Sequence, residues 1–172
     1  MYVGKLLVAT PQLIDPNFFR SVVLVLQHEE DGCVGVVLNR STVARVADHL
    51  PDWAELSTTE FVHYGGPVEP EVAIGLGNTD QGMESGLAGL SLVDLGRDPP
   101  HHNIAEVRIF SGYAGWGAGQ LEAEIAIGSW YVVDAFPDDA FGNPDGQWRR
   151  VLQRQPGTLS LVATYPEDVT LN

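Results

Sequence analysis

Two short runs rich in β-branched residues constrain the fold most: SVVLVLQH (Ser21–His28) and CVGVVLN (Cys33–Asn39), separated by the four residues EEDG. Each run is too short for a helix and is apolar at consecutive positions, so each predicts a strand that is buried on both faces. A four-residue connection that ends in Asp-Gly is typical of a hairpin turn. We therefore expect a β-hairpin whose two faces are both covered by other parts of the chain.

Further strands are predicted where short apolar runs lie between glycines and prolines, of which the chain has 19 and 11. These strands are Phe61–Val68, Val72–Asn78, Ser91–Leu95, Glu106–Gly112, Ser129–Phe136 and Thr158–Pro166. Apart from Ser91–Leu95, the stretch 79–103 is predicted to be loop, because Gly, Asp, Pro and Asn interrupt it repeatedly.

Three helices are predicted between these strands. Ser41–Leu50 carries apolar residues at helical spacing and is followed by Pro51, which cannot continue a helix. Gly119–Gly128 ends on a glycine suited to a C-terminal cap, and Asp145–Gly157 is amphipathic. Because strands outnumber helices and hairpins mix with crossovers, the predicted class is α+β with a mixed, mostly antiparallel sheet. A chain of 172 residues is expected to form a single domain over residues 1–172.

The stretch FSGYAGWGAGQLEAEI (Phe110–Ile125) places four glycines directly before a predicted helix. Glycine at this density forms either a cradle for a phosphate or a tight backbone turn. The spacing matches neither the dinucleotide fingerprint nor the P-loop, and Glu122 and Glu124 would repel a phosphate at the start of this helix. We therefore predict a turn from strand into helix, with Tyr113 and Trp116 folded back as aromatic plugs. No cofactor is predicted.

The chain is strongly acidic, with 9 Lys and Arg against 23 Asp and Glu and a formal net charge of −14. This charge opposes binding to nucleic acid and to anionic lipid, because both rest on neutralising phosphates with Lys and Arg. No apolar run approaches the roughly 18–20 residues of a membrane helix, and the amino end lacks the features of a signal peptide. The single cysteine suits a reducing compartment. We therefore expect a cytoplasmic protein without direct contact to membranes or nucleic acid.

Histidine and cysteine offer little recognisable catalytic chemistry. Hairpin pairing is expected to place His28 opposite Cys33, and a thiol beside a histidine can act as a nucleophile. No orienting acid or oxyanion hole accompanies the pair, so we interpret Cys33 as a small buried thiol beside a polar histidine. His101 and His102 are adjacent but lack the spacing of a zinc site. The sequence predicts no catalytic residue and no metal.

A polar pocket beside the glycine-rich stretch is the remaining candidate site. Gln120 and Glu124 lie four residues apart on one face of the predicted helix, close to Trp116. Such a pair either lines a ligand pocket, forms a solvated stripe, or braces loop amides, and the sequence does not decide between these roles. The candidate pocket residues are His28, Asn39, Tyr113, Trp116, Gln120 and Glu124.

Four segments resemble the AlgH/YqgE family of bacterial proteins of uncharacterised function: GKLLVATPQL, FFRSVVLVLQHEEDGCVGVVLNR, YGGPV and FSGYAGWGAGQLEAEIAIGSW. The most specific mark is the order G-Y-A-G-W-x-x-x-Q-L-E-x-E in the last segment. The resemblance covers nearly the whole chain and implies one α+β domain whose sheet curls into a pseudo-barrel with flanking helices. It also implies a cytoplasmic protein, sometimes labelled a transcriptional regulator, without established catalytic residues.

Two classes of function follow from these observations. The first is a non-enzymatic binding or regulatory module that acts through contacts with a protein or a small ligand. The alternative is an unrecognised enzyme with a pocket near Glu122, Glu124 and His28. An enzyme is expected to carry an activated nucleophile or a paired acid and base at a telling spacing, and none is visible in the sequence. We therefore predict the first class, with a protein or small-molecule partner whose identity the sequence does not indicate.

Overall fold

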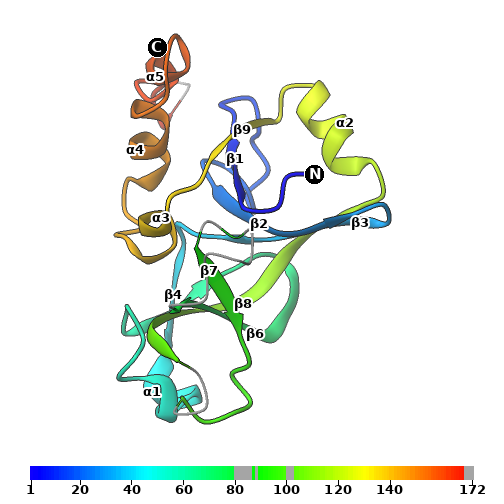
Figure 1. The fold of residues 1–172 in the computed structure, drawn as a ribbon. Coiled ribbons are helices and arrows are strands. Elements are labelled where there is room, and N and C mark those ends of the chain that lie inside the picture. The colour runs from blue at the N-terminus through cyan, green and yellow to red at the C-terminus, as the bar shows by residue number, and fades with distance from the viewer. Residues whose placement is uncertain (80–86, 88, 100–102, 169–172) are drawn as a thin grey trace.

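A mixed, nine-stranded β-sheet forms the centre of the computed structural model, which describes residues 1–79, 87, 89–99 and 103–168 (Figure 1). The strands are β1 (Lys5–Ala9), β2 (Val22–Glu29), β3 (Gly32–Val37), β4 (Ser41–Arg45), β5 (Phe61–Tyr64), β6 (Val68–Thr79), β7 (Leu90–Val93), β8 (Ile104–Gly117) and β9 (Trp130–Asp134). Their order is β4-β5-β8-β3-β2-β1-β9, and β6 pairs with both β7 and β8. Among the strand ladders of the described residues, only β5–β8 is parallel. The predicted α+β class with a mixed, mostly antiparallel sheet is confirmed.

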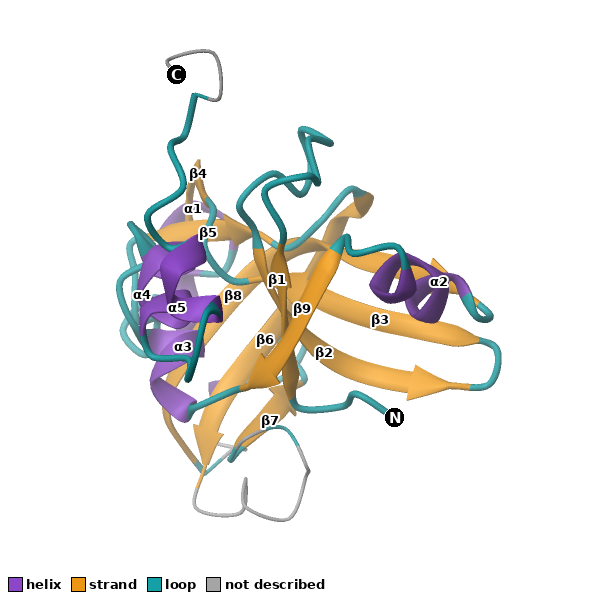
Figure 2. Cartoon of the chain, turned by 90° about the horizontal axis from the view of Figure 1, so that it is seen from above, coloured by secondary structure: helices purple, strands orange, loops and turns teal. Residues whose placement is uncertain are grey.

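Short helices flank the sheet on opposite sides (Figure 2). They are α1 (Val46–His49), the 3-10 turn η1 (Pro51–Trp53), α2 (Gln120–Ala126), α3 (Pro137–Phe141), α4 (Gln147–Gln153) and α5 (Leu159–Val162). The last three lie together on one side and α2 on the other, while α1 lies at the far end of the molecule (Figures 1 and 2). In the described part of the chain, no helix is long and apolar enough to cross a membrane.

The hairpin of β2 and β3 is buried on both faces, as predicted. Alternate residues of β2 enter two separate apolar clusters: Leu24 belongs to the cluster that α4 covers, and Val23 to the cluster that α2 covers. The third cluster surrounds Trp53 near α1 and η1. Because neighbouring side chains of a strand point to opposite faces, a continuous apolar run requires this double cover.

Strand β8 connects the two halves of the sheet. Its carboxyl-terminal part pairs with β3 and its earlier part with β5 and β6. Gly112 lies between these parts with φ +69°, and a Cβ atom there would come within 2.6 Å of the Gly66 carbonyl oxygen. The Gly65 amide donates to the Ser111 carbonyl at 2.8 Å. The glycines of YGGPV and GYAGW therefore allow two backbones to approach where the sheet changes partners.

The glycine-rich stretch differs in part from the prediction. Gly115 and Gly117 continue β8, because the stretch 114–117 pairs with β3, and neither glycine has a positive φ. The turn into the helix lies later, at Gly119 with φ +69°, and α2 follows it as predicted. Gly128, with φ +82°, follows the end of α2 and donates its amide to Ile125, in agreement with the predicted cap.

Two other predicted elements are wrong. Ser41–Leu50 is not one helix: its first half is β4, which pairs with β5, and only Val46–His49 is helical. The Thr42 hydroxyl donates to the Val62 carbonyl across this pair, so strand pairing overrides the helical spacing. Thr158–Pro166 is not a strand but contains α5, which packs against α4. An alternating apolar pattern of this length does not separate a strand from a short covering helix.

Strands β1 and β9, which lie far apart in the sequence, pair antiparallel from Lys5 opposite Asp134 to Ala9 opposite Trp130. The sequence predicted β9 but not β1. In the described residues the strand order ends at β4 and at β9 without pairing between those two strands, so the sheet is open. The curl into a pseudo-barrel therefore stays a prediction.

Candidate functional site

Two of the predicted site residues, Trp116 and Gln120, bond to the carboxylate of a third, Glu124 on α2. The Glu124 Oε2 atom accepts hydrogen bonds from the indole nitrogens of Trp116, at 2.9 Å, and Trp130, at 2.8 Å. The Gln120 side chain donates to the other carboxylate oxygen, Oε1, at 3.0 Å. Elements β8, α2 and β9 each contribute to this arrangement, which we call the Trp–Glu–Trp cluster (residues 116, 120, 124 and 130).

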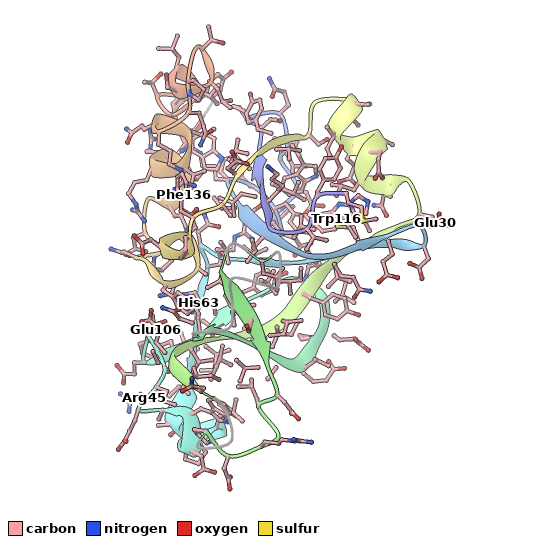
Figure 3. The ribbon with its side chains drawn as sticks, viewed as in Figure 1. Glu30, Arg45, His63, Glu106, Trp116 and Phe136 are labelled. Atoms are coloured by element: carbon pink, nitrogen blue, oxygen red, sulfur yellow. The ribbon has the colours of Figure 1, made fainter. Side chains whose placement is uncertain are left out.

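The Trp–Glu–Trp cluster also closes the turn between β8 and α2. The Gln120 Oε1 atom accepts a hydrogen bond from the Gly117 amide at 3.0 Å. The two indole rings meet edge to face at 6.0 Å between ring centroids, and Phe18 contacts both. Trp116 lies between α2 and the β2–β3 hairpin (Figure 3). Both oxygens of the carboxylate therefore bond to protein groups, as expected of a brace for loop amides.

His28 lies next to this cluster but bonds to a different carboxylate of α2. Its Nε2 atom is 2.8 Å from Glu122 Oε1, and its Nδ1 atom accepts the Tyr2 amide at 3.1 Å. The imidazole also stacks on the Tyr2 ring at 5.2 Å. Because Nδ1 is an acceptor, the hydrogen bonds assign the ring proton to Nε2, which donates to Glu122.

Cys33 pairs opposite His28 in the sheet, as the hairpin predicted. The thiol is buried, and burial together with the negative charge of Glu122 raises the pKa of Cys33 to about 11. At neutral pH the sulfur is therefore protonated and a poor nucleophile. The His28 proton that faces Glu122 is not placed to activate it.

Asn39 and Tyr113 do not join the Trp–Glu–Trp cluster. Asn39 accepts the Val22 amide and donates to the Arg20 carbonyl, each at 2.9 Å, and so holds the chain at the start of β2. The Tyr113 hydroxyl donates to Glu69 Oε2 at 2.8 Å. Tyr113 and Trp116 do line a common cavity of about 420 Å³ beside the β2–β3 hairpin, while Asn39 lines another of about 200 Å³. Whether any of the six candidates binds a ligand stays a prediction.

A more apolar cavity lies where β4 and α1 meet β6 and β8, and we call it the edge cavity. Its volume is about 390 Å³, and it is lined by Ala44, His49, Leu50, Val62, Pro70, Glu71, Val72, Ala73, Ile109, Phe110 and Ser111. Val62, Ile109 and Phe110 are buried, whereas Val72 is 40% exposed. Polar lining groups come from His49, Glu71 and Ser111. The sequence pattern missed this cavity, because its residues come from five separate elements: β4, α1, β5, β6 and β8.

A buried pair of basic residues was also missed. Arg108 is 1% exposed and donates to Thr58 Oγ1 and to the carbonyls of Phe141 and Gly142, at 2.8–2.9 Å. Burial lowers the pKa of this arginine to about 10. His63 is fully buried nearby, and burial with the charge of Arg108 lowers the pKa of His63 to about 4. The arginine bonds fasten β8 to the end of α3, so Arg108 serves the fold.

Metal ligands do not gather in the part of the chain that the structure describes, where no group of three His, Cys, Asp or Glu side chains is placed to hold an ion. His101 and His102 lie outside the described residues.

Comparison with known proteins gives consistent results. The family model described as AlgH-like matches residues 6–160. A UPF0301 protein of Streptomyces coelicolor is 48% identical over 183 residues, which covers 98% of this chain and 94% of that protein. A UPF0301 protein of Thermobifida fusca is 44% identical with the same coverage.

Two solved structures are similar along nearly the full length. The crystal structure of a Corynebacterium diphtheriae protein has a TM-score of 0.88 at 33% identity, and covers 96% of this chain and 93% of that one. The solution structure of the AlgH protein from Pseudomonas aeruginosa has a TM-score of 0.70 at 26% identity, with 95% and 93% coverage.

Proposed function

The chain belongs to the AlgH-like family, and from this premise we propose that it is a non-enzymatic binding module whose ligand is a small amphiphilic molecule held in the edge cavity. Any regulatory role would then depend on whether this cavity is occupied. The proposal includes a cytoplasmic location, because a single buried thiol suits a reducing compartment.

The shape and lining of the edge cavity carry this proposal. A volume of about 390 Å³ falls within the range of small-molecule sites, which are typically apolar with a few polar groups that orient the ligand. The buried side chains of Val62, Ile109 and Phe110 supply apolar surface, and His49 and Glu71 supply polar groups. By contrast, the carboxylate of the Trp–Glu–Trp cluster already bonds to the protein at both oxygens.

Charge favours a neutral or cationic ligand. The formal net charge of −14 gives the protein a negative field, and Glu71 adds a carboxylate at the cavity itself. An anionic ligand would enter against this field, whereas a cation would be attracted. The same field argues against direct contact with DNA, so a regulatory role through the DNA backbone is not part of the proposal.

The contacts of the candidate catalytic residues support a non-enzymatic role. Glu124 binds two indoles, Glu122 binds His28, and the thiol of Cys33 is protonated at neutral pH. A general base needs a lone pair directed at a substrate, and a nucleophile needs an activating base. Glu122, Glu124 and His28 therefore use their functional groups within the fold, and Cys33 lacks the thiolate of a nucleophile at neutral pH.

Binding of the neutral dye Nile red, measured by fluorescence, tests the proposal. We expect the wild-type protein to bind Nile red and Val72→Asp to lose most of that binding, because a charge then lines the apolar cavity. Leu92→Asp is the matched control, since Leu92 is also apolar and 59% exposed but lies on β7 outside the cavity lining. Absence of binding by the wild type, or equal loss in both variants, would contradict the proposal.

A further inference from the structure

We propose that a separate cavity, between the start of β2 and the start of α4, is a binding site for a small oxyanion, a carboxylate or a phosphate group. The cavity measures about 200 Å³, and its lining includes Arg20, Asn39, Gln147, Trp148, Arg149 and Glu167. We call it the arginine cavity. The site does not depend on the edge cavity or on the function proposed for it.

Arg20 and Arg149 both line this cavity, and their hydrogen bonds to the backbone leave their charges in place. Arg20 donates to the Tyr165 carbonyl at 2.5 Å, and Arg149 donates to the carbonyls of Ala163 and Tyr165 at 2.6 and 3.5 Å. Backbone carbonyls are neutral, so these bonds orient the arginines without neutralising them. Burial and the charge of Arg149 lower the pKa of Arg20, as expected where two cations lie close together.

A carboxylate of the chain itself approaches this positive region. Glu167 Oε1 lies 3.9 Å from Arg20 Nη1, and its side chain is 76% exposed. A charge-assisted hydrogen bond between such groups is about 2.7–2.9 Å long, so this ion pair is loose. Asp145 also lines the cavity, so an incoming oxyanion must lie apart from this second carboxylate. Because the pair of Glu167 with Arg20 is loose, an oxyanion that bonds to both arginines can replace Glu167.

The arginine cavity is held in shape before any ligand binds. The side chain of Arg20 is only 14% exposed, and its guanidinium lies 4.3 Å from the centroid of the Trp148 ring. The backbone of Arg20 has φ +53°, which is unfavourable for a residue other than glycine, and Asn39 binds its carbonyl. An arginine that is already ordered loses less conformational entropy on binding an anion.

Gln147 fixes the wall of the cavity at the start of α4. It is 3% exposed, and its Nε2 atom donates to the Asp139 carbonyl at 2.6 Å. Its Oε1 atom is buried as well, so neither polar atom of this side chain is presented to a ligand. Recognition of the oxyanion therefore rests on Arg20 and Arg149.

NMR titration with inorganic phosphate, glycolate and acetate tests the site, with the Trp148 indole and the arginine Nε–H groups as reporters. Ionic strength is held constant with chloride, because unspecific screening would otherwise shift the same signals. We expect phosphate, or the two carboxylates glycolate and acetate, to shift these signals in the wild type. Phosphate binding without glycolate binding assigns the site to phosphate, and the reverse assigns it to carboxylates.

Four variants distinguish binding at this site from general electrostatic attraction. Glu167→Gln removes the competing carboxylate and should tighten binding several-fold, whereas Arg149→Gln should weaken it about tenfold or more. Glu60→Gln is the control, because Glu60 is also exposed but pairs with Arg45. Arg149→Lys keeps the charge without the planar fork and serves if Arg149→Gln unfolds; it should weaken binding as well. Absence of shifts in the wild type, equal affinity in the arginine variants, or unchanged affinity in Glu167→Gln would overturn the proposal.

Discussion

Substitution of Glu124 by glutamine tests whether the Trp–Glu–Trp cluster stabilises the fold. In the wild type, one carboxylate oxygen accepts two indole N–H groups and the other accepts the Gln120 amide. Gln120 in turn accepts the Gly117 amide. Each hydrogen bond of this network pairs one N–H donor with one oxygen acceptor. The Glu124 carboxylate has no donor of its own, so the network ends there.

Glutamine at position 124 cannot satisfy the same partners. If its new NH₂ group faces Gln120, two donors meet; if Gln120 rotates to correct this, its own NH₂ group meets the Gly117 amide. If the NH₂ group faces the indoles instead, Trp116 and Trp130 both lose their acceptor. Gln120 is exposed, so water can pair its donors, but the partly buried indole bonds change from charge-assisted bonds, worth about 1.5–3 kcal/mol, to neutral bonds, worth about 0.5–1.5 kcal/mol.

We therefore expect Glu124→Gln to lower the free energy of unfolding by about 2–3 kcal/mol. For a chain of this size that corresponds to a fall in Tm of roughly 4–12 °C. Circular dichroism during thermal and urea unfolding measures both quantities. Glu122→Gln is the control: the hydrogen bond from His28 to Glu122 is partly exposed, at 48% for the glutamate, so its loss should cost under about 1 kcal/mol.

A double-mutant cycle with Trp130→Phe checks the mechanism. Removing the indole donor at 2.8 Å from the carboxylate should make Glu124→Gln less damaging, with a coupling of about 0.5–3 kcal/mol. A Glu124→Gln stability within about 0.5 kcal/mol of Glu122→Gln, or a raised Tm, would refute the reasoning. A raised Tm would instead favour a carboxylate held in place for function.

The remaining predictions concern backbone strain, buried titration and thiol reactivity. Gly112→Ala should lower the free energy of unfolding, measured with urea, by about 3 kcal/mol or more, because its Cβ would meet backbone atoms. Gly128 also has a positive φ but no neighbours within 4 Å, so Gly128→Ala should lower it by about 1 kcal/mol. Equal losses in the two variants would contradict this reasoning. Since the pKa of His63 is about 4 in the folded protein and near 6.5 when unfolded, the unfolded chain gains a proton as pH falls from 6.5 to 4 and the fold loses up to about 3 kcal/mol. His63→Leu should lack this loss, so an unchanged pH dependence of its unfolding would argue against it. Cys33 should resist iodoacetamide at pH 7.5 in the native state and react once unfolded, as followed by mass spectrometry; rapid native labelling would contradict the raised pKa.

The sequence predicted the elements whose conformation depends on residues that are neighbours along the chain. The β2–β3 hairpin follows from β-branched runs on either side of Asp-Gly, and α2 and α4 follow from apolar spacing and from glycines at their ends. The errors occurred where a distant partner decides the conformation. Ser41–Arg45 is a strand because β5 pairs with it, and Gly115 and Gly117 are extended because β3 does.

The sequence predicted the site residues that lie on or next to one helix. Gln120 and Glu124 were identified by their spacing of four residues, and Trp116 by its place in the preceding motif. Trp130, the second indole donor, follows the helix on another strand, where no periodicity links it to Glu124. Arg20 and Arg149 lie still further apart, so only the folded chain brings their charges together.

The pairing of β1 with β9 has a consequence for synthesis of the chain. Lys5 and Asp134 are separated by 129 residues, which a ribosome adds in roughly 6–26 s at about 5–20 residues per second. During this interval β1 can form its ladder with β2, while its other edge, KLLVA, has no partner strand. An unpaired apolar strand edge is a template for aggregation. A nascent chain therefore exposes the first strand of the sheet until the last one emerges to cover it.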